Sequence, residues 1–347
     1  MKKIIIITVV MIFVLIVMNF YYFSPAAFIA KNQGTVLDDN WYNALTWVNK
    51  NTEKCAVIAT YWDPGHFITG IARRPVVFDG ASQGDTIYST DTKYSGLEPG
   101  EIVTEKYDNG IVQIIRKINE PYIVDYISKH YPQYSNGTER ARIKDIAISL
   151  FTSNESLALK YLKDYRQAGC KEFYYIASSD LIGKSTWWTY FATWNPEGSE
   201  KPCSGELNKG SCYNYMTVGL GQARPAPSEN AIVYTYPFGT QQAFLIYEVN
   251  STRRAFLQQG SQIARVSNLM FFTQSQGLIT TEEGAEVNGL LVQSPDKGSI
   301  IFMPPELQNS MFTRLMFFDG TGLQNFQLVN NWGGEVKLYK VTFPESS

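Results

Sequence analysis

The stretch Ala56-Val-Ile-Ala-Thr-Tyr-Trp-Asp-Pro-Gly65 decides the fold class of this chain. Its first five residues form a short apolar run, which predicts a buried strand that Pro-Gly brings to an end. A helical spacing of apolar residues over 39–50 precedes the strand. The apolar run Phe173–Ala177 also follows a predicted helix, over 154–167, and also leads to an aspartate, Asp180. Because helices alternate with buried strands, we expect an α/β mixed core with a mostly parallel sheet.

Aspartates follow each of the predicted strands of this core. Asp63 and Asp180 follow the two strands above, and Asp79 follows a third, Pro75–Phe78. The carboxyl ends of parallel strands open at one edge of a sheet, so we expect these side chains to share one rim. The alternative for Asp63 and Asp79 is that each only starts a turn. A metal-dependent hydrolase is disfavoured, because only His66 lies nearby and two-metal sites need more ligands.

The pattern changes from about residue 228, where short strands recur. We therefore predict an α/β core over 31–225 and a β-rich C-terminal module over 226–347. Residues 185–215 are predicted to be an aromatic, cysteine-bearing insertion. Asn288-Gly289 stands between apolar runs, which is a hairpin turn signal.

The N-terminus is a long apolar run. Ile4 to Met18 holds no charge, and Phe20–Phe23 continues the run. About twenty helical residues span roughly 30 Å, so residues 1–30 predict a single transmembrane helix and a membrane location. Lys2-Lys3 favours a cytoplasmic N-terminus with the bulk of the chain extracellular. A cleaved signal peptide, with a mediocre site at Ala26-Ala27, is the alternative.

The composition excludes several classes of protein. Apolar residues make up 44% of the chain and charged residues 18%, which excludes a disordered protein. The net charge of −2 gives no basic footprint, so no nucleic-acid partner is expected. His66 and His130 are the only histidines, which disfavours most histidine-based metal sites.

Cysteines and sequons fit an external location. Cys203 and Cys212 bracket a short polar loop and are a candidate disulfide. Cys55 and Cys170 either pair with each other or are each a small buried hydrophobe. Three sequons, each a candidate for a glycan outside the cell, begin at Asn136, Asn154 and Asn250.

Tyr61-Trp-Asp-Pro-Gly65 resembles the WWDYG signature of the catalytic subunit of oligosaccharyltransferase, the enzyme of protein N-glycosylation, and its archaeal form most closely. Ser179-Asp-Leu-Ile-Gly-Lys-Ser-Thr-Trp-Trp188 resembles the family's Asp/Lys (DK-type) motif. Further segments resemble the family in the same order along the chain: Trp41–Thr52, Pro75–Gly80 and Ser310–Gly320. Two departures are Tyr61 and Pro64, which replace Trp and Tyr of the signature. A third is the spacing from Asp180 to Lys184, which is one residue longer.

The resemblance implies a site that binds the acceptor polypeptide. The family reads the sequon Asn-x-Ser/Thr through the hydroxyl of its third residue. Trp62 can only donate a hydrogen bond and ionised Asp63 can only accept one, so the pair complements a hydroxyl. The substrate-binding residues carried over from the family motifs are Tyr61, Trp62, Asp63, Gly65, Asp180 and Lys184.

The resemblance also implies that catalysis needs more than this chain. Family members have many membrane helices before this domain, and their external loops hold the acidic metal ligands. We therefore expect no catalytic residue and no cofactor in this chain. A divalent metal such as Mg or Mn is expected only in a complete enzyme, and a separate multi-spanning membrane subunit would bind the lipid-linked oligosaccharide. The alternative is a non-catalytic extracellular binding or surface-structural protein that retains the fold.

Overall fold

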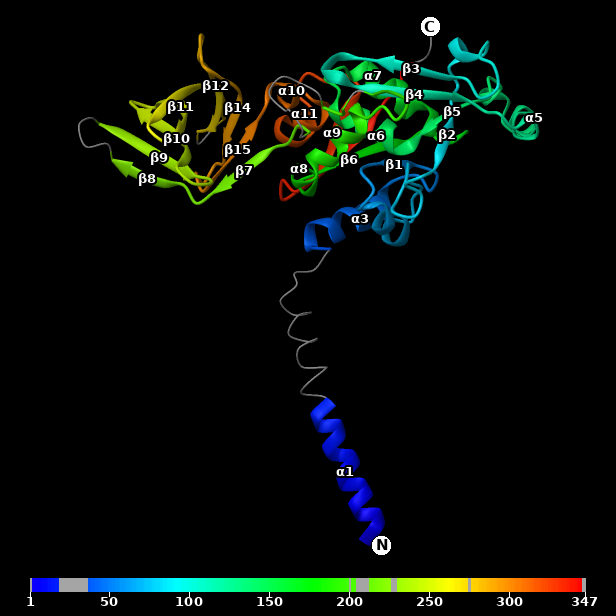
Figure 1. The fold of residues 1–347 in the computed structure, drawn as a ribbon, viewed down its shortest axis with the longest axis horizontal. Helices are drawn as coiled ribbons and strands as arrows, with labels where there is room; N and C mark the ends of the chain where they lie inside the picture. Colours follow the sequence, from blue (N-terminus) through cyan, green and yellow to red (C-terminus); the bar gives the residue numbers. More distant parts are fainter. Residues whose placement is uncertain are drawn as a thin grey trace. The chain divides into compact units, whose positions relative to one another are not determined.

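The computed structural model describes residues 2–18, 37–199, 201–203, 212–225, 230–273 and 276–344. These residues belong to two units, Met1–Asn43 and Ala44–Ser347 (Figure 1). Helix α3 (Asp39–Asn51) matches the helix predicted over 39–50, and its first residues belong to the first unit.

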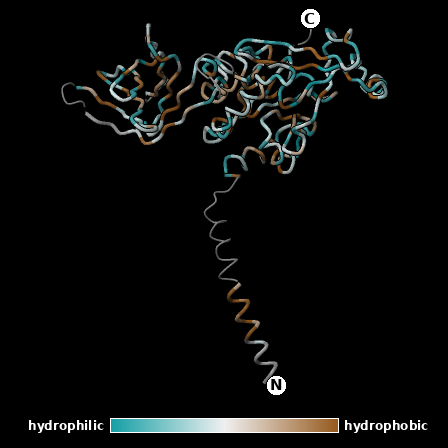
Figure 2. Tube along the Cα trace, viewed as in Figure 1, coloured by the Kyte–Doolittle hydropathy of each residue, from teal (hydrophilic) through white to brown (hydrophobic). Residues whose placement is uncertain are grey.

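Helix α1 (Lys2–Met18) is the apolar N-terminal segment, and the part of it nearer Met18 is brown in Figure 2, which marks that character. Its side chains from Val10 to Met18 are exposed. Within the described part of the chain, no helix has both the length and the apolar character needed to cross a membrane. The predicted single transmembrane helix is therefore not confirmed, and Phe20–Phe23 lies outside the described residues.

A four-stranded sheet forms the centre of the second unit. Its strands, in order across the sheet, are β1 (Val57–Ala59), β6 (Phe173–Ser178), β17 (Val336–Val341) and β16 (Phe326–Trp332). Only β1 and β6 pair in parallel, with an added parallel bridge between Ile58 and Val76. The expectation of a mostly parallel sheet is wrong, because β17 and β16 form an antiparallel hairpin from the chain's C-terminal end.

Helices around this sheet complete the main core. They are α6 (Arg142–Phe151), α7 (Glu155–Leu162), α8 (Asp180–Gly183), α9 (Ser185–Thr193), α10 (Pro305–Gln308) and α11 (Met311–Phe318). Large side chains such as Phe151, Trp188 and Phe312 are fully buried among them. The mixed α/β core is therefore confirmed, although helices and strands from after residue 300 help to build it.

A second sheet is inserted between β1 and β6. Its strands are β2 (Thr86–Tyr88), β5 (Thr138–Ala141), β4 (Val112–Lys117) and β3 (Ile102–Lys106), in this order, and α5 (Pro121–His130) lies between β4 and β5 along the chain. A disulfide joins Cys55, just before β1, to Cys170, just before β6. The crosslink therefore closes the whole inserted segment at its base and settles the pairing that the sequence left open.

The β-rich half forms a nine-stranded sheet with its own apolar core. Its strands are β7 (Met216–Gly219), β8 (Gln222–Pro225), β9 (Ala231–Pro237), β10 (Gln242–Val249), β11 (Thr252–Gln259), β12 (Gln262–Phe272), β13 (Gly277–Thr281), β14 (Val287–Gln293) and β15 (Ser299–Met303). The hairpin predicted at Asn288-Gly289 is wrong, since both residues lie inside β14. Gly289 is needed there for another reason: a Cβ would lie 2.4 Å from the Phe302 ring. The predicted domain boundaries remain predictions.

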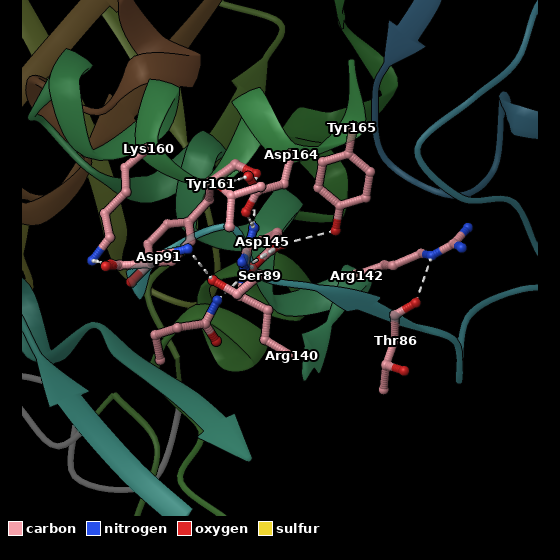
Figure 3. A network of polar contacts seen from close by, with 12 residues as sticks. Thr86, Ser89, Asp91, Arg140, Arg142, Asp145, Lys160, Tyr161, Asp164 and Tyr165 are labelled. Atoms are coloured by element: carbon pink, nitrogen blue, oxygen red, sulfur yellow. Dashed lines mark hydrogen bonds and ion pairs between the residues drawn. The ribbon is translucent and has the colours of Figure 1, made fainter. Parts of the chain in front are cut away.

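A buried ion network joins the inserted sheet to the core helices (Figure 3). Arg140, on β5, is 4% exposed. Its Nε lies 2.9 Å from Oδ2 of Asp145 and its Nη2 lies 2.8 Å from Oδ2 of Asp164. Tyr165 donates its hydroxyl to Oδ2 of Asp145 at 2.8 Å. Two carboxylates thus share one guanidinium inside the protein.

A second polar cluster surrounds Glu105 on β3. Its carboxylate accepts hydrogen bonds from Lys93 Nζ at 2.8 Å, Lys160 Nζ at 3.1 Å and the Tyr161 hydroxyl at 3.0 Å. Burial raises the pKa of Glu105, but the bonds from Lys93 and Tyr107 outweigh it and hold the pKa well below its ordinary value. The contribution of Glu105 to stability is therefore present above the ordinary pKa of 4.5 and is lost as the pH falls towards the lower folded-state pKa.

We expect Glu105→Gln to flatten the acid side of the stability curve. Urea midpoints of the wild type should fall steadily below about pH 4.5, the range in which the carboxylate of the unfolded chain takes up a proton first. Those of the variant should fall less steeply, because glutamine does not titrate. The exposed Glu120→Gln is the control and should keep the wild-type slope. Equal slopes for all three proteins would contradict the role of Glu105.

Candidate functional site

Asp63, Asp180 and Lys184 lie together at the carboxyl ends of β1 and β6. The two strands are parallel neighbours, so the residues that follow them reach the same edge of the sheet. Lys184 Nζ lies 2.6 Å from Oδ2 of Asp63 and 2.7 Å from Oδ2 of Asp180. The three side chains are 33–41% exposed, so a ligand can reach them. The structure thus brings together two of the three aspartates expected on one rim.

The charges of this cluster are coupled. Partial burial lowers the pKa of Lys184, but its hydrogen bonds to Asp180 and Asp63 outweigh burial and raise the pKa above its ordinary value. Ser178 donates its hydroxyl to the other oxygen of Asp180. Asp180 is therefore held from two sides, whereas Asp63 lies at the open end of the cluster, with 41% of its side chain exposed.

Tyr61 and Trp62 differ in their surroundings. Tyr61 is fully buried, and its ring packs against Phe78 and against Trp62, whose ring centroid is 4.0 Å away. Burial raises the pKa of the Tyr61 hydroxyl, and the charge of Asp63 adds to this effect. Trp62 is half-buried, with Phe191 of α9 on its edge at a centroid distance of 6.0 Å. Of the two aromatic residues predicted to bind substrate, Trp62 is partly exposed and Tyr61 is fully buried against it.

Lys144 supports Trp62 indirectly, through Phe191, and was not among the residues predicted from the sequence. Its side chain is buried, and Nζ donates to the carbonyl oxygens of Phe191 and Trp194, both at 2.7 Å. Burial lowers the pKa of Lys144 to about 7. Lysine binds the last carbonyls of α9 and so fixes the residue that packs on Trp62. The available signal was the position of Lys144 and Asp145 just before the mostly apolar run Ile146–Phe151 of α6.

Gly65 is required by backbone packing. A Cβ at this position would lie 2.6 Å from Cβ of Asp79 and 2.8 Å from the carbonyl oxygen of Phe78. Asp79 in turn accepts hydrogen bonds from the backbone N–H groups of Ala81 and Ser82 at 3.0 and 3.1 Å. Asp79 thus starts a turn, the alternative left open by the sequence, and its second oxygen lies 3.5 Å from Nδ1 of His66.

We expect Gly65→Ala to lower the free energy of unfolding by about 1–3 kcal/mol, because the added methyl meets backbone atoms that cannot move easily. Gly70→Ala is the matched control, since nothing lies within 4 Å of a Cβ there. It should leave stability unchanged or raise it by up to about 1 kcal/mol, because alanine is the better helix former. Urea unfolding of the two variants tests this, and equal midpoints would contradict it.

The remaining predicted sites also have places in the structure. Cys203 and Cys212 form a disulfide. Asn136 is 7% exposed and its amide donates to the Asp91 carbonyl at 2.7 Å, which leaves no room for a glycan in the folded chain. Asn154 is exposed and caps α7, and Asn250 is exposed in a turn.

One group among the described residues has the spacing of a metal site: Glu53, Cys55 and Cys170. Both cysteines are in a disulfide, and the thiolate is the form that ligates metal, so this group does not fit a metal while the bond is intact.

Comparison with known proteins gives relatives in one family. No family model matches the sequence. The chain is 22% identical over 345 residues to the dolichyl-phosphooligosaccharide-protein glycotransferase of Methanocaldococcus jannaschii, covering 88% of this chain and 34% of the relative. It is 23% identical over 340 residues to the protein of that name from Methanococcus voltae, covering 84% and 35%. The chain thus spans about a third of the length of these relatives.

Solved structures give looser matches. The C-terminal domain of C. jejuni PglB matches with a TM-score of 0.46 and 11% identity, over 87% of this chain and 99% of that one. The C-terminal globular domain of an Archaeoglobus fulgidus oligosaccharyltransferase matches with a TM-score of 0.33 and 12% identity, over 89% and 100%. Neither match is close enough to support a functional assignment. The sequence matches, however, confirm the resemblance carried by the motifs: along most of its length the chain is related to the archaeal dolichyl-phosphooligosaccharide-protein glycotransferases.

Proposed function

We propose that this chain reads the sequon of an acceptor polypeptide, as an external globular part of an N-glycosylation apparatus. The observation that carries the proposal is the position of Trp62 and Asp63 at an accessible strand end, with Lys184 bound to Asp63 at 2.6 Å. The relatedness to archaeal glycotransferases supports it.

The chemistry of the pair fits a hydroxyl. Lys184 contacts one oxygen of Asp63, and a carboxylate has about four lone-pair positions, so it can also accept from a threonine or serine hydroxyl. The Trp62 indole can donate to the oxygen of the same hydroxyl. A peptide with alanine at this place would leave the Trp62 N–H without this acceptor and Asp63 with Lys184 alone, so the site discriminates against it.

Asp63→Ala should remove the preference for Asn-x-Thr over Asn-x-Ala peptides, which we expect to be about 1–3 kcal/mol, or roughly 5- to 150-fold in affinity. The fold should persist, because Lys184 keeps its contact with Asp180. NMR titration of labelled peptides measures the preference. Asp125→Ala, on the exposed side of α5, is the control and should keep it. Equal binding of both peptides to the wild type would instead favour a surface protein that retains only the fold.

We also propose that glycan transfer needs a separate multi-spanning membrane subunit, which would hold the divalent metal and the lipid-linked oligosaccharide. Metal-assisted activation needs several carboxylates around one ion. The relatives are named as glycotransferases, and this chain aligns with about a third of their length. Purified chain mixed with lipid-linked oligosaccharide, Mg or Mn and acceptor peptide is expected to give no glycopeptide, and turnover by the chain alone would overturn the proposal.

The apolar run Ile4–Phe23 would hold the chain at the membrane in a single pass, with the globular part outside the cell. The exposed apolar side chains Val10 to Met18 support this placement, since lipid would cover them. Extraction of membranes at high pH tests it: the whole chain should remain with the lipid, and a chain that lacks residues 1–30 should be released.

A further inference from the structure

The sequon at Asn250 lies in a tight turn between β10 and β11. Val249 pairs with Thr252, which leaves Asn250 and Ser251 as a two-residue loop. Both loop residues have positive φ, 48° and 66°, as a type I′ hairpin turn requires, and asparagine is favoured there. The turn therefore explains Asn250 by itself, but it does not explain the surface beside it.

That surface is a hollow of about 660 Å³, in the size range of small-molecule sites. The hollow is lined by Tyr247, Thr252, Arg254, Phe256 and Ile263. These residues lie on β10, β11 and β12, neighbouring strands that are labelled in Figure 1, and Asn250 also lines the hollow. The rings of Tyr247 and Phe256 meet edge to face, with centroids 5.2 Å apart.

Apolar side chains are left uncovered in this hollow. Ile263 is 55% exposed and Val249 is 38% exposed, although both lie in regular strands. Arg254, paired with Glu282 at 3.1 Å, adds hydrogen-bond donors at the edge. Aromatic faces and a guanidinium together suit a sugar, which has apolar C–H faces and hydroxyls around its rim.

We propose that Asn250 carries an N-linked glycan and that the first sugars of this glycan lie in the hollow of its own domain. The first and third residues of the sequon both line the hollow, so a sugar on Asn250 starts within reach of the Tyr247 and Phe256 rings. Asn250 and Thr252 are both exposed, as an acceptor sequon must be.

The proposed modification transfers a glycan from a lipid-linked oligosaccharide to Asn250. Nδ2 of Asn250 forms a bond to the anomeric carbon of the first sugar and loses one proton to a basic group of the transferring enzyme. The bond between that carbon and the phosphate oxygen of a lipid-linked oligosaccharide breaks, and the lipid phosphate leaves with the bonding pair. In this reaction the chain is the acceptor, so the proposal does not depend on its own sequon-binding site. It does depend on the proposed external location.

The experiment uses the full chain made in cells that perform N-glycosylation, followed by digestion and mass spectrometry. We expect a glycan at Asn250 and none at the buried Asn136. Asn250→Gln and Thr252→Ala should abolish it, and Thr252→Ser should retain it. A reporter sequon protein led by residues 1–36 shows whether chains with this N-terminus meet the transferring enzyme. If Asn250 carries no glycan while the reporter is glycosylated, the proposal is overturned. An unglycosylated reporter also overturns it, because a chain that is not exported cannot carry the glycan.

Thermal unfolding tests the place of the sugars. The glycosylated chain should melt roughly 1–3 °C above Asn250→Asp, which removes the acceptor amide but keeps a residue suited to the positive φ of the turn. This difference should vanish when both proteins also carry Phe256→Ala. The milder exposed change Ile263→Ser should reduce it, which keeps the test usable if the Phe256 variant folds poorly. An undiminished difference in both backgrounds would show that the glycan does not use the hollow.

Discussion

Replacing Arg140 with methionine is expected to lower the free energy of unfolding by about 3–5 kcal/mol, which is the usual effect of removing one partner from a buried ion pair. Asp145 and Asp164 would then face each other without the guanidinium that both of them contact. The side chains of Asp145 and Asp164 are each at most 2% exposed, so water cannot replace the guanidinium as their hydrogen-bond donor. Urea or thermal unfolding of purified protein measures the loss.

The control for Arg140 is an exposed pair on helix α5. Lys129 and Asp125 lie 2.7 Å apart at i, i+4, with both side chains more than 60% exposed. Lys129→Ala should change stability by about 0.5 kcal/mol or less, since solvent screens such pairs. If Arg140→Met were as mild as Lys129→Ala, the network would have no role in joining the inserted sheet to the core.

Trp188→Ala is expected to cost about 3–5 kcal/mol, as large-to-small changes of buried aromatic residues do. Trp188 is fully buried, packs against the Phe151 and Phe312 rings, and donates its Nε1–H to the Leu181 carbonyl at 3.0 Å. Its sequence neighbour Trp187 is 57% exposed. Trp187→Ala should change stability by about 0.5 kcal/mol or less.

The two tryptophan variants also separate packing from binding. Trp188 lies on α9, the helix whose Phe191 packs against Trp62, so its loss should weaken the proposed peptide binding together with stability. Loss of Trp187 should leave the folded protein intact. Similar unfolding midpoints for the two variants would contradict the burial that distinguishes these neighbours.

The candidate site could be predicted because it depends on local order along the chain. Two helix–strand–aspartate patterns in succession imply adjacent parallel strands, and adjacent strands place Asp63 and Asp180 at one edge. The four-residue spacing from Asp180 to Lys184 then returns the lysine to the same aspartate. Tyr61 and Trp62 could not be told apart in this way, because their exposure depends on Phe78 and Phe191 from other elements.

What the sequence did not predict depends on distant contacts. The central sheet is mostly antiparallel because β17 returns from the chain end to pair with β6, and no local pattern encodes that pairing. Asn288-Gly289 has the composition of a turn, but the close approach of Phe302 uses the glycine inside a strand instead. Lys144 acts through carbonyl groups nearly fifty residues away.

The disulfide between Cys55 and Cys170 has a mechanical consequence. The two cysteines are 115 residues apart, and at about 3.3–3.6 Å per residue this segment has a stretched length of roughly 400 Å. When the chain is pulled from its two ends, the load passes through the covalent bond at the start of β1 and β6, and the inserted sheet carries none of it. The chain can therefore bear tension without lengthening through this segment, and the strands that lead to Asp63 and Asp180 stay joined at their base.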